Sequence, residues 1–547
     1  MTRRIFLSFL LCIPLVANAQ KSENHNSSIA RNLEIFNEIY RILDTYYVDS
    51  LSADTVMEWG INAMLNRVDP YTAYYPQDDD ELMEMAQGKY AGIGAVIRYH
   101  KGLKRAVISE PYEGTPSMKA GLLPGDIIMS IDNQDIEGLL TDKVSNMLRG
   151  EAGTTLLLKV QRPGEKKQRS LTITRETIAI PHVPYYGMVK DKVGYIMLTG
   201  FTDGDAQQMR AAVIDLKQQG AQSLVLDLRD NPGGSLDESV DIANLFLPKG
   251  KKIVYTKGKL ESMNREYYTR MEPVDTVIPL TVLVDGGSAS AAEILSGSLQ
   301  DMDRAVIIGT RTYGKGLVQN IRELPYGGNM KLTTGRYYIP SGRCIQAYDY
   351  RHLNEDGSAR TLPDSLTNLF HTMRGREVRD GGGIKPDILV TPDTLPTMVY
   401  DLAPSDALFD FCTKYVSEHP TFGKPGEASL TDAEYDAFVN FVKEQDFSYN
   451  RRTDEVMDLL RDVASREGYM DLVQGEYEAL KSRLTTDVSA DLYRLRKSIE
   501  PYLLDELVTR YYHRKGTCRQ QLVGDKCLEK ALEILGDEKA YNEILRP

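Results

Sequence analysis

The stretch VIPLTVLVDGGSASAAEILSGSLQDMDRAVIIGTRTYGKGLVQ, residues 277–319, decides the fold of this chain. It reads as an apolar strand, a turn of small residues, a helix, a second apolar strand and a loop that holds one lysine. Strands that alternate with helices indicate an α/β core with parallel strands. The same order can bring Ser290, in the turn, close to Lys315, in the loop. The stretch therefore predicts the chemistry of a serine hydrolase.

Ser290 is the predicted nucleophile. A serine hydroxyl is a poor nucleophile until another group removes its proton. Ser290 stands where the strand over 279–285 turns into a helix, so the amide of Ala291 and the positive helix end would face a developing oxyanion. Small neighbours leave its hydroxyl uncovered. Ser288 is the alternative nucleophile, but its position inside the turn favours a structural role.

Lys315 is the predicted general base. A free lysine has a pKa of ~10.4, so about one in 10³ is neutral at pH 7, and burial in an apolar pocket can lower that pKa by a few units. Gln319 falls on the same face if KGLVQ is extended, and its amide oxygen could orient the amine. A single lysine is usually a solvated surface charge. The flanking glycines, the glutamine and the serine turn together favour the catalytic interpretation.

A second glycine-rich loop is the candidate oxyanion site. LVLDLRDNPGGSLDE, residues 224–238, runs from a buried strand through Gly233 and Gly234 into a helix. This arrangement leaves backbone amides free at the edge of a sheet. One of these two glycine amides, together with that of Ala291, is predicted to form an oxyanion hole, and the sequence does not decide which. The alternative is a plain turn and helix start.

The flanking segments predict several domains. Residues 178–395 alternate strands and helices, and within them the polar stretch 347–380 is expected to be an inserted surface loop. Residues 30–86 form a small helical region, and residues 401–547 read as a charged helical domain. Residues 1–19 have a basic pair, a short apolar run and small residues at the end, which predicts a cleaved secretory signal. An uncleaved membrane anchor is the alternative.

Composition excludes some classes of partner. The net charge of −13 argues against nucleic acid as a partner. The seven histidines show no metal-binding motif, so neither a metal nor another cofactor is predicted. Cys518 and Cys527 could close a local disulfide in an oxidising compartment, and two free buried thiols are an equal alternative.

Residues 89–177 resemble a PDZ domain. The segment consists of short β-rich runs with two short helical stretches, and PGDII launches one of the strands. By that resemblance, YAGIGAVI supplies the loop whose amides hold the terminal carboxylate of a peptide, which points to Gly92, Ile93 and Gly94. Glycine allows the close approach that such a loop needs. The alternative is that these glycines shape a tight turn.

The whole pattern from 30 to 395 resembles the carboxy-terminal processing, or tail-specific, proteases of the S41 class. The resemblance is carried, in order, by VDPYTAYY, YAGIGAVI, LDLRDNPGG, SASAAE, GTRTYGKGLVQ, YYIPSGRCIQ and GIKPDILV. It implies a multidomain α/β fold with a ClpP/crotonase-like protease core and an inserted PDZ domain. It also implies a serine/lysine dyad assisted by glutamine, and Ser290, Lys315 and Gln319 match those residues.

The expected function is therefore that of an exported, periplasmic serine endopeptidase. It would cut polypeptides near their C-termini after its PDZ domain has engaged the substrate tail. One alternative is a peptide-binding scaffold that no longer cuts, and another is a hydrolase of small esters. The helices after residue 401 are not explained by the shared core. Self-association or docking of an adaptor protein through them is a hypothesis.

Overall fold

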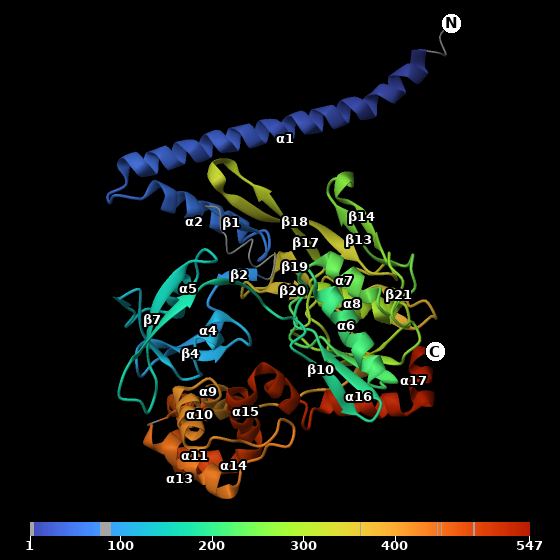
Figure 1. Ribbon diagram of the computed structural model, residues 1–547. Helices are drawn as coiled ribbons and strands as arrows, with labels where there is room; N and C mark the ends of the chain where they lie inside the picture. Colours follow the sequence, from blue (N-terminus) through green and yellow to red (C-terminus); the bar gives the residue numbers. More distant parts are fainter. Residues whose placement is uncertain are drawn as a thin grey trace. The chain divides into compact units, whose positions relative to one another are not determined.

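The computed structural model describes residues 5–76, 89–361, 363–445, 447–449, 451–484 and 487–546, with side chains from residue 25 onward (Figure 1). The chain forms two compact units. One comprises Met1–Asp79 and Gln319–Thr333, and the other comprises Asp80–Val318 and Thr334–Pro547. The chain passes from one unit to the other inside strand β17 (Leu317–Glu323) and again inside strand β18 (Asn329–Tyr338).

The first unit contains the N-terminal helices. Its elements are α1 (Ile5–Tyr46), α2 (Ala53–Leu65) and β1 (Ala73–Tyr75), which pairs antiparallel with the first residues of β18. Ser52 caps the start of α2, and its side chain accepts a hydrogen bond from the amide of Thr55. Residues 5–19 of the predicted leader form the start of α1. Among the described helices, none has the length and apolar character needed to cross a bilayer.

A six-stranded sheet forms the centre of the second unit. Its strand order is β10-β11-β12-β15-β16-β23; β10 is antiparallel to β11, and the remaining neighbours are parallel. This confirms the predicted α/β core. The strands are β10 (Tyr185–Lys190), β11 (Val193–Met197), β12 (Ser223–Asp227), β15 (Leu280–Val284), β16 (Val306–Gly309) and β23 (Ile388–Leu389).

Alternate side chains of this sheet enter two different cores. Leu224 and Leu226 pack in a cluster with α6 (Asp205–Gln218), α7 (Leu236–Ala243) and α8 (Ala291–Asp301). Val225, between them, packs in a second cluster with residues of α16 (Lys526–Gly536) and α17 (Glu538–Leu545). The last two helices of the chain therefore cover one face of the central sheet (Figure 1).

A second sheet and the insertion complete this part of the unit. Strand β13 (Lys252–Gly258) pairs with β14 (Arg265–Tyr268) and with the end of β18. The segment 347–380, predicted as a surface loop, instead contains two hairpins. These are β19 (Tyr348–Leu353) with β20 (Ala359–Thr361), and β21 (Leu369–His371) with β22 (Glu377–Arg379). Arg376 fixes the second hairpin to the core through the buried carboxylate of Asp303, 2.6 Å away.

The PDZ-like region has its own sheet and core. Its main strands follow the order β3-β4-β5-β7-β8, so β3 is an edge strand. The region contains β2 (Lys89–Gly92), β3 (Ala95–His100), β4 (Arg105–Pro111), α4 (Pro116–Lys119), β5 (Ile127–Ile131), β6 (Gln134–Asp135), α5 (Thr141–Leu148), β7 (Thr155–Gln161), β8 (Arg169–Thr174) and β9 (Glu176–Ala179). Buried aliphatic side chains such as Ile108, Ile128 and Leu158 form its core.

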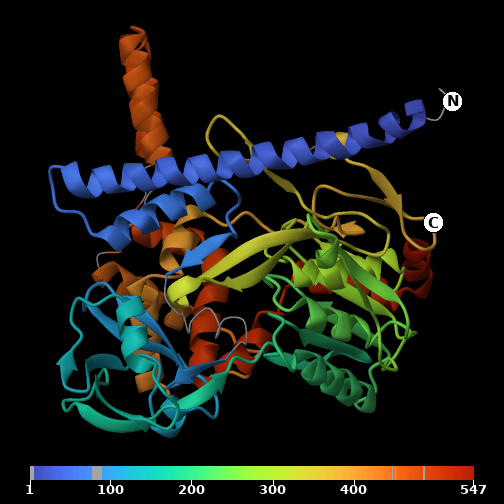
Figure 2. The ribbon, with the colours of Figure 1, turned by 90° about the horizontal axis from the view of Figure 1, so that it is seen from above.

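The C-terminal region is helical, as predicted, and its helices before α16 form a group of their own. It contains α9 (Thr397–Leu402), α10 (Asp406–Glu418), α11 (Asp432–Glu444), α12 (Arg452–Arg466), α13 (Met470–Leu484), α14 (Val488–Arg494) and α15 (Arg496–Gln520). Most of these helices share one apolar core. Within α12 and α13 the buried residues are Met457 and Tyr477, and Figure 2 shows this orange pair extending away from the other helices.

The PDZ-like region is attached to this helical region through β3. The Arg98 guanidinium donates to the carbonyl of Pro404 at 2.7 Å and to Asp406 at 3.1 Å. The buried His100 ring lies 3.0 Å from the carboxylate of Asp410. Burial acts to lower the pKa of His100, but the hydrogen bond and charge of Asp410 and the charge of Asp406 raise it above its ordinary value. The edge strand expected to receive a substrate tail is thus held by helix α10.

Candidate active site

Ser290 lies in a strained turn between β15 and α8. Its backbone has φ +55° and ψ −113°, a conformation that residues other than glycine seldom adopt. Strain of this kind persists where the surrounding structure enforces it, and it clusters at functional sites. The residue stands directly before the first residue of α8, Ala291, as the sequence predicts.

The remainder of the turn is held from inside. The buried hydroxyl of Ser288 donates to the carbonyl of Leu228 at 2.8 Å and accepts from the amide of Asp285 at 3.0 Å. The carboxylate of Asp285 in turn accepts from the amides of Gly287 and Ser288. Ser288 is therefore engaged in shaping the turn, which agrees with its predicted structural role.

A fully buried carboxylate joins Ser290 to Lys315. One oxygen of Glu293, Oε2, accepts hydrogen bonds from the amides of both Ser290 and Lys315, each at 2.9 Å. The other oxygen, Oε1, accepts from the Thr312 hydroxyl at 2.6 Å and from the Gly314 amide at 2.8 Å. The structure thus brings the predicted nucleophile and the loop of the predicted base onto one side chain.

Tyr337 provides a second link between the same two residues. Its ring is buried, and its hydroxyl hydrogen-bonds the carbonyl of Ser290, 3.1 Å away, and the carbonyl of Lys315. Lys315 itself is partly buried. Sequence reasoning missed both Glu293 and Tyr337. The spacing Ser-x-x-Glu at 290–293, typical of a helix capping box, is the signal that could have found Glu293.

The predicted oxyanion residues meet beside Ser290. Gly233 has φ +98°, and a Cβ atom on it would lie 2.8 Å from both the Ala291 nitrogen and the Ser290 Cβ. This close approach requires glycine. The amide of Gly233 donates to the side-chain oxygen of Asn231 at 2.9 Å. Of the three predicted donors, Gly233 is therefore already engaged in this structure.

Gln319 lies in the first unit, on β17. Its side-chain amide donates to the hydroxyl of Thr333 at 3.3 Å. Lys315 belongs to the second unit. The predicted contact of Gln319 with the lysine amine stays a prediction.

Hydrogen bonds from neighbouring residues hold the predicted tail-binding loop in place. Gly94 has φ +75°, and its carbonyl accepts from the Ser117 hydroxyl at 2.6 Å and from the Tyr112 amide at 2.9 Å. The carbonyl of Ile93 accepts from the Ser117 amide at 2.8 Å. The loop that contains Gly92, Ile93 and Gly94 leads directly into the edge strand β3.

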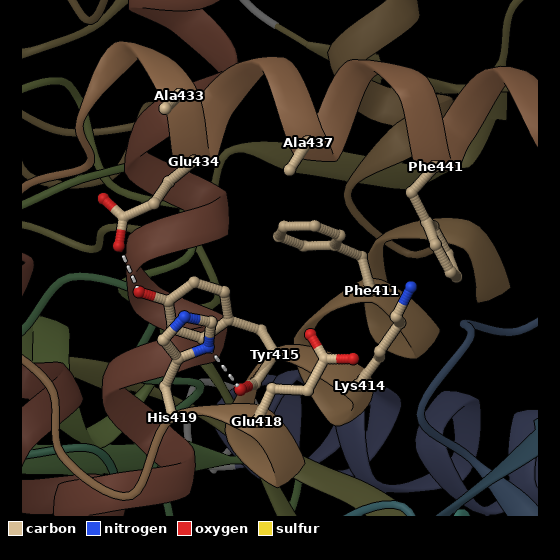
Figure 3. A pocket seen from close by; sticks show the side chains of 9 residues that line it. All are labelled: Phe411, Lys414, Tyr415, Glu418, His419, Ala433, Glu434, Ala437 and Phe441. Atoms are coloured by element: carbon tan, nitrogen blue, oxygen red, sulfur yellow. Dashed lines mark hydrogen bonds between the residues drawn. The ribbon is translucent and has the colours of Figure 1, made fainter.

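A pocket of about 280 Å³ lies elsewhere, between α10 and α11 of the helical region (Figure 3). The ring of Tyr415 stacks on His419 with centroids 4.0 Å apart, and its hydroxyl donates to Glu434. None of its lining residues belongs to the loops around Ser290.

The cysteines at 344, 412, 518 and 527 are free thiols, so the structure has no bond between Cys518 and Cys527.

Glu293 makes a testable prediction about pH. Burial raises the pKa of its carboxyl to about 7, although its hydrogen bonds act to lower it. A group with a raised folded-state pKa loses its contribution to stability as the pH rises from the unfolded-state to the folded-state value. The substitution Glu293→Gln removes this titration. Relative to that variant, the natural chain should therefore lose about 3 kcal/mol of unfolding free energy between about pH 4 and pH 8.

Urea unfolding of the protease core at the two pH values measures this difference. The contributions of all other titrating groups to the pH dependence of stability cancel in this comparison, because the two chains share those groups. A stability difference that does not change with pH would contradict the prediction. Cleavage by Glu293→Gln should also fall, because its side-chain NH₂ group would face donors that need an acceptor.

Comparisons with known proteins identify the domains of the chain. Residues 192–354 match the model of peptidase family S41, residues 107–162 that of a PDZ domain, and residues 398–535 that of the probable PDZ-protease C-terminal helical domain. A carboxy-terminal-processing protease of Bartonella bacilliformis is 35% identical over 342 residues, which are 61% of this chain and 78% of that protein.

The chain is also similar to a second curated protein and to a solved structure. A probable CtpA-like serine protease of Staphylococcus aureus is 34% identical over 330 residues, which are 60% of this chain and 65% of that protein. Among solved structures, the photosystem II D1 C-terminal processing protease is 28% identical, with a TM-score of 0.35; the match covers 66% of this chain and 93% of that one.

Proposed function

We propose that this chain, which belongs to peptidase family S41 and is a serine protease of the carboxy-terminal-processing kind, cuts exported polypeptides near their C-termini with a Ser290–Lys315 dyad. The observation that carries the proposal is the buried Glu293. One oxygen of its carboxylate, Oε2, accepts hydrogen bonds from the amides of both Ser290 and Lys315. A nucleophile and a base on separate loops need such a shared support, because even a small displacement of the reacting groups lowers the reaction rate strongly.

The proposed reaction begins at the Ser290 hydroxyl. Its oxygen attacks the scissile carbonyl carbon while neutral Lys315 accepts its proton, and the carbonyl oxygen becomes an oxyanion. The amide of Ala291 would stabilise this charge together with the amide of Gly234, or with that of Gly233 if its hydrogen bond to Asn231 is released. Lys315 then gives the proton to the leaving amine, and water hydrolyses the acyl-enzyme. Gln319 is proposed to orient the lysine.

The PDZ-like region is proposed to select the substrate by its tail. The amides of Gly92, Ile93 and Gly94 would hold the terminal carboxylate. The edge strand β3, which follows this loop, would pair with the peptide backbone. Export through a cleaved leader over residues 1–19 would bring the enzyme together with envelope polypeptides.

A pair of peptides tests the requirement for a free tail. An unstructured polypeptide with a free C-terminus should be cut faster than the same polypeptide with an amidated C-terminus, because amidation removes the charge that the loop would hold. In cells, replacement of the natural gene by Ser290→Ala should make envelope proteins accumulate with longer C-termini, as measured by proteomics of C-terminal peptides. Unchanged C-termini together with equal cleavage of both peptides would count against the proposal.

A further inference from the structure

An ion pair joins the end of the chain to the loop beside Ser290. The guanidinium of Arg229 donates to the carboxylate of Asp525 at 2.5 Å, across 296 residues of sequence. The Asp525 side chain is 9% exposed, and that of Arg229 is 23% exposed, so water screens this pair little. Asp525 precedes α16, one of the two helices that cover the central sheet.

Arg229 is held from its other side by Asp227. The Asp227 carboxylate accepts from the backbone amide of Arg229 at 3.0 Å and from its guanidinium at 2.5 Å. The same carboxylate accepts from the buried hydroxyl of Tyr195 at 2.6 Å. Burial acts to lower the pKa of Arg229, but Asp227 and Asp525 raise it above its ordinary value. The cation therefore stays charged between two carboxylates.

The oxyanion loop begins at this arginine. Asp230 follows with φ +54°, and the carbonyl of the buried Asn231 accepts from the Ala289 amide, next to Ser290, at 2.9 Å. Gly233 then lies so near Ser290 that a Cβ atom on it would be 2.8 Å from the Ser290 Cβ. Only a few backbone bonds separate Arg229 from the candidate oxyanion donors. A shift of the arginine would therefore move these donor amides as well.

We propose that Asp525 is a positioning residue for the oxyanion loop. By holding Arg229 from the start of α16, it would fix the strand end from which the loop departs, so that the last helices of the chain set the geometry of the catalytic amides. The proposal rests on the proposed function, because it concerns the rate of the same Ser290 reaction.

The two oxygens of Asp525 have separate partners, and this makes a clean test available. Oδ1 accepts from the amides of Cys527 and Leu528 at 2.9 and 3.1 Å and so caps α16. Oδ2 binds Arg229. Asparagine caps helices about as well as aspartate. The variant Asp525→Asn therefore keeps the cap and loses the charge-assisted bond, while Arg229 keeps Asp227 as its partner.

Asp537→Asn is the matched control. Asp537 caps the next helix, α17, through the amides of Lys539 and Ala540, each at 3.0 Å. Asp537→Asn should keep the melting temperature of the natural chain, and Asp525→Asn should lower it only slightly, because Arg229 keeps Asp227 as its partner. Asp525→Asn should lower kcat about five- to thirtyfold with KM within twofold, because the loss acts on the transition state. Asp537→Asn should leave both constants unchanged.

A peptide aldehyde separates positioning from a general loss of structure. The Ser290 hydroxyl would add to its carbonyl carbon, the hydroxyl proton would end on the aldehyde oxygen or on Lys315, and that oxygen would occupy the oxyanion hole. Its inhibition constant should weaken in Asp525→Asn by the same factor as kcat. Binding of an uncleaved tail peptide to the PDZ-like region should not change.

Two results would overturn the proposal. One is equal kcat and equal aldehyde affinity in Asp525→Asn and Asp537→Asn. The other is a fall of kcat that disappears when the assay is run well below the melting temperature of the variant, since that pattern belongs to destabilisation of α16. Failure of the proposed function itself is distinguishable, because the Ser290→Ala variant would then still cleave.

Discussion

Replacement of Ser290 by alanine is expected to abolish cleavage, with a fall in kcat on the order of 10⁴- to 10⁶-fold. The variant removes the oxygen that would attack the carbonyl carbon. It leaves the turn intact, because the Ser290 backbone, with its amide on Glu293 and its carbonyl on Tyr337, remains. Initial rates on an unfolded polypeptide measure the change. Ser417→Ala, at an exposed serine of α10, is the control and should cleave normally.

Lys315→Arg tests the base in the same assay. Arginine keeps the positive charge and much of the length of lysine, but it is not deprotonated in proteins. If neutral Lys315 accepts the proton of Ser290, Lys315→Arg should be about as inactive as Lys315→Ala. Substantial cleavage by the arginine variant would mean that position 315 acts through its charge, and the dyad mechanism would then be wrong.

Removal of α16 and α17 is expected to unfold the protease core. A chain that ends at residue 523 would expose the sheet face that Leu528, Ile534, Tyr541 and Leu545 now cover. Burial of one large apolar side chain is worth about 1.5–3 kcal/mol, so these four contribute on the order of 6–12 kcal/mol. A whole domain is stable by about 5–15 kcal/mol. The truncated chain should be insoluble or lack the core's unfolding transition.

A second deletion is the control for this truncation. Replacement of residues 452–484 by a short glycine–serine linker removes α12 and α13, whose buried residues are Met457 and Tyr477. A hydrogen bond between the Arg451 guanidinium and the Leu484 carbonyl shows that the two ends are close. This deletion should leave the unfolding of the core unchanged. A soluble, active chain that ends at residue 523 would contradict the prediction.

The full-length chain with Ile534→Ala gives a graded version of the same test. The side chain of Ile534 is buried against the sheet. Its removal should cost about 2–5 kcal/mol of unfolding free energy.

The hypothesis that the C-terminal helices serve self-association or an adaptor applies best to the exposed faces of α12 and α13, where Leu459, Leu460 and Leu472 are at least half exposed.

Much of the fold follows from local patterns. The apolar runs at 224–228 and 280–284 predicted parallel strands, and the small residues at 286–292 predicted the turn into α8. The two hairpins within the predicted insertion 347–380 were not foreseen, because a polar composition does not distinguish a loop from short surface hairpins. Arg376, which fixes one hairpin to Asp303, reads in sequence as an ordinary solvated charge.

The candidate site divides in the same way. Its nucleophile, base and oxyanion loop were predicted as catalytic from short motifs, and those roles stay predictions. Glu293 was within reach of the sequence because a capping box has a fixed three-residue spacing. Tyr337 was not, because its contacts with the carbonyls of Ser290 and Lys315 depend on how β18 passes the two loops.

The sequence by itself determined the family, the parallel core, and the order in which the PDZ-like region, the candidate nucleophile Ser290 and the loop of Lys315 follow one another. These are properties of short segments, whose spacing limits the local conformation. Tertiary structure alone decided that α16 and α17 cover one face of the central sheet and that Asp525 pairs with Arg229. Contacts across 296 residues depend on the packing of whole apolar faces, and neither partner carries a local pattern that identifies the other.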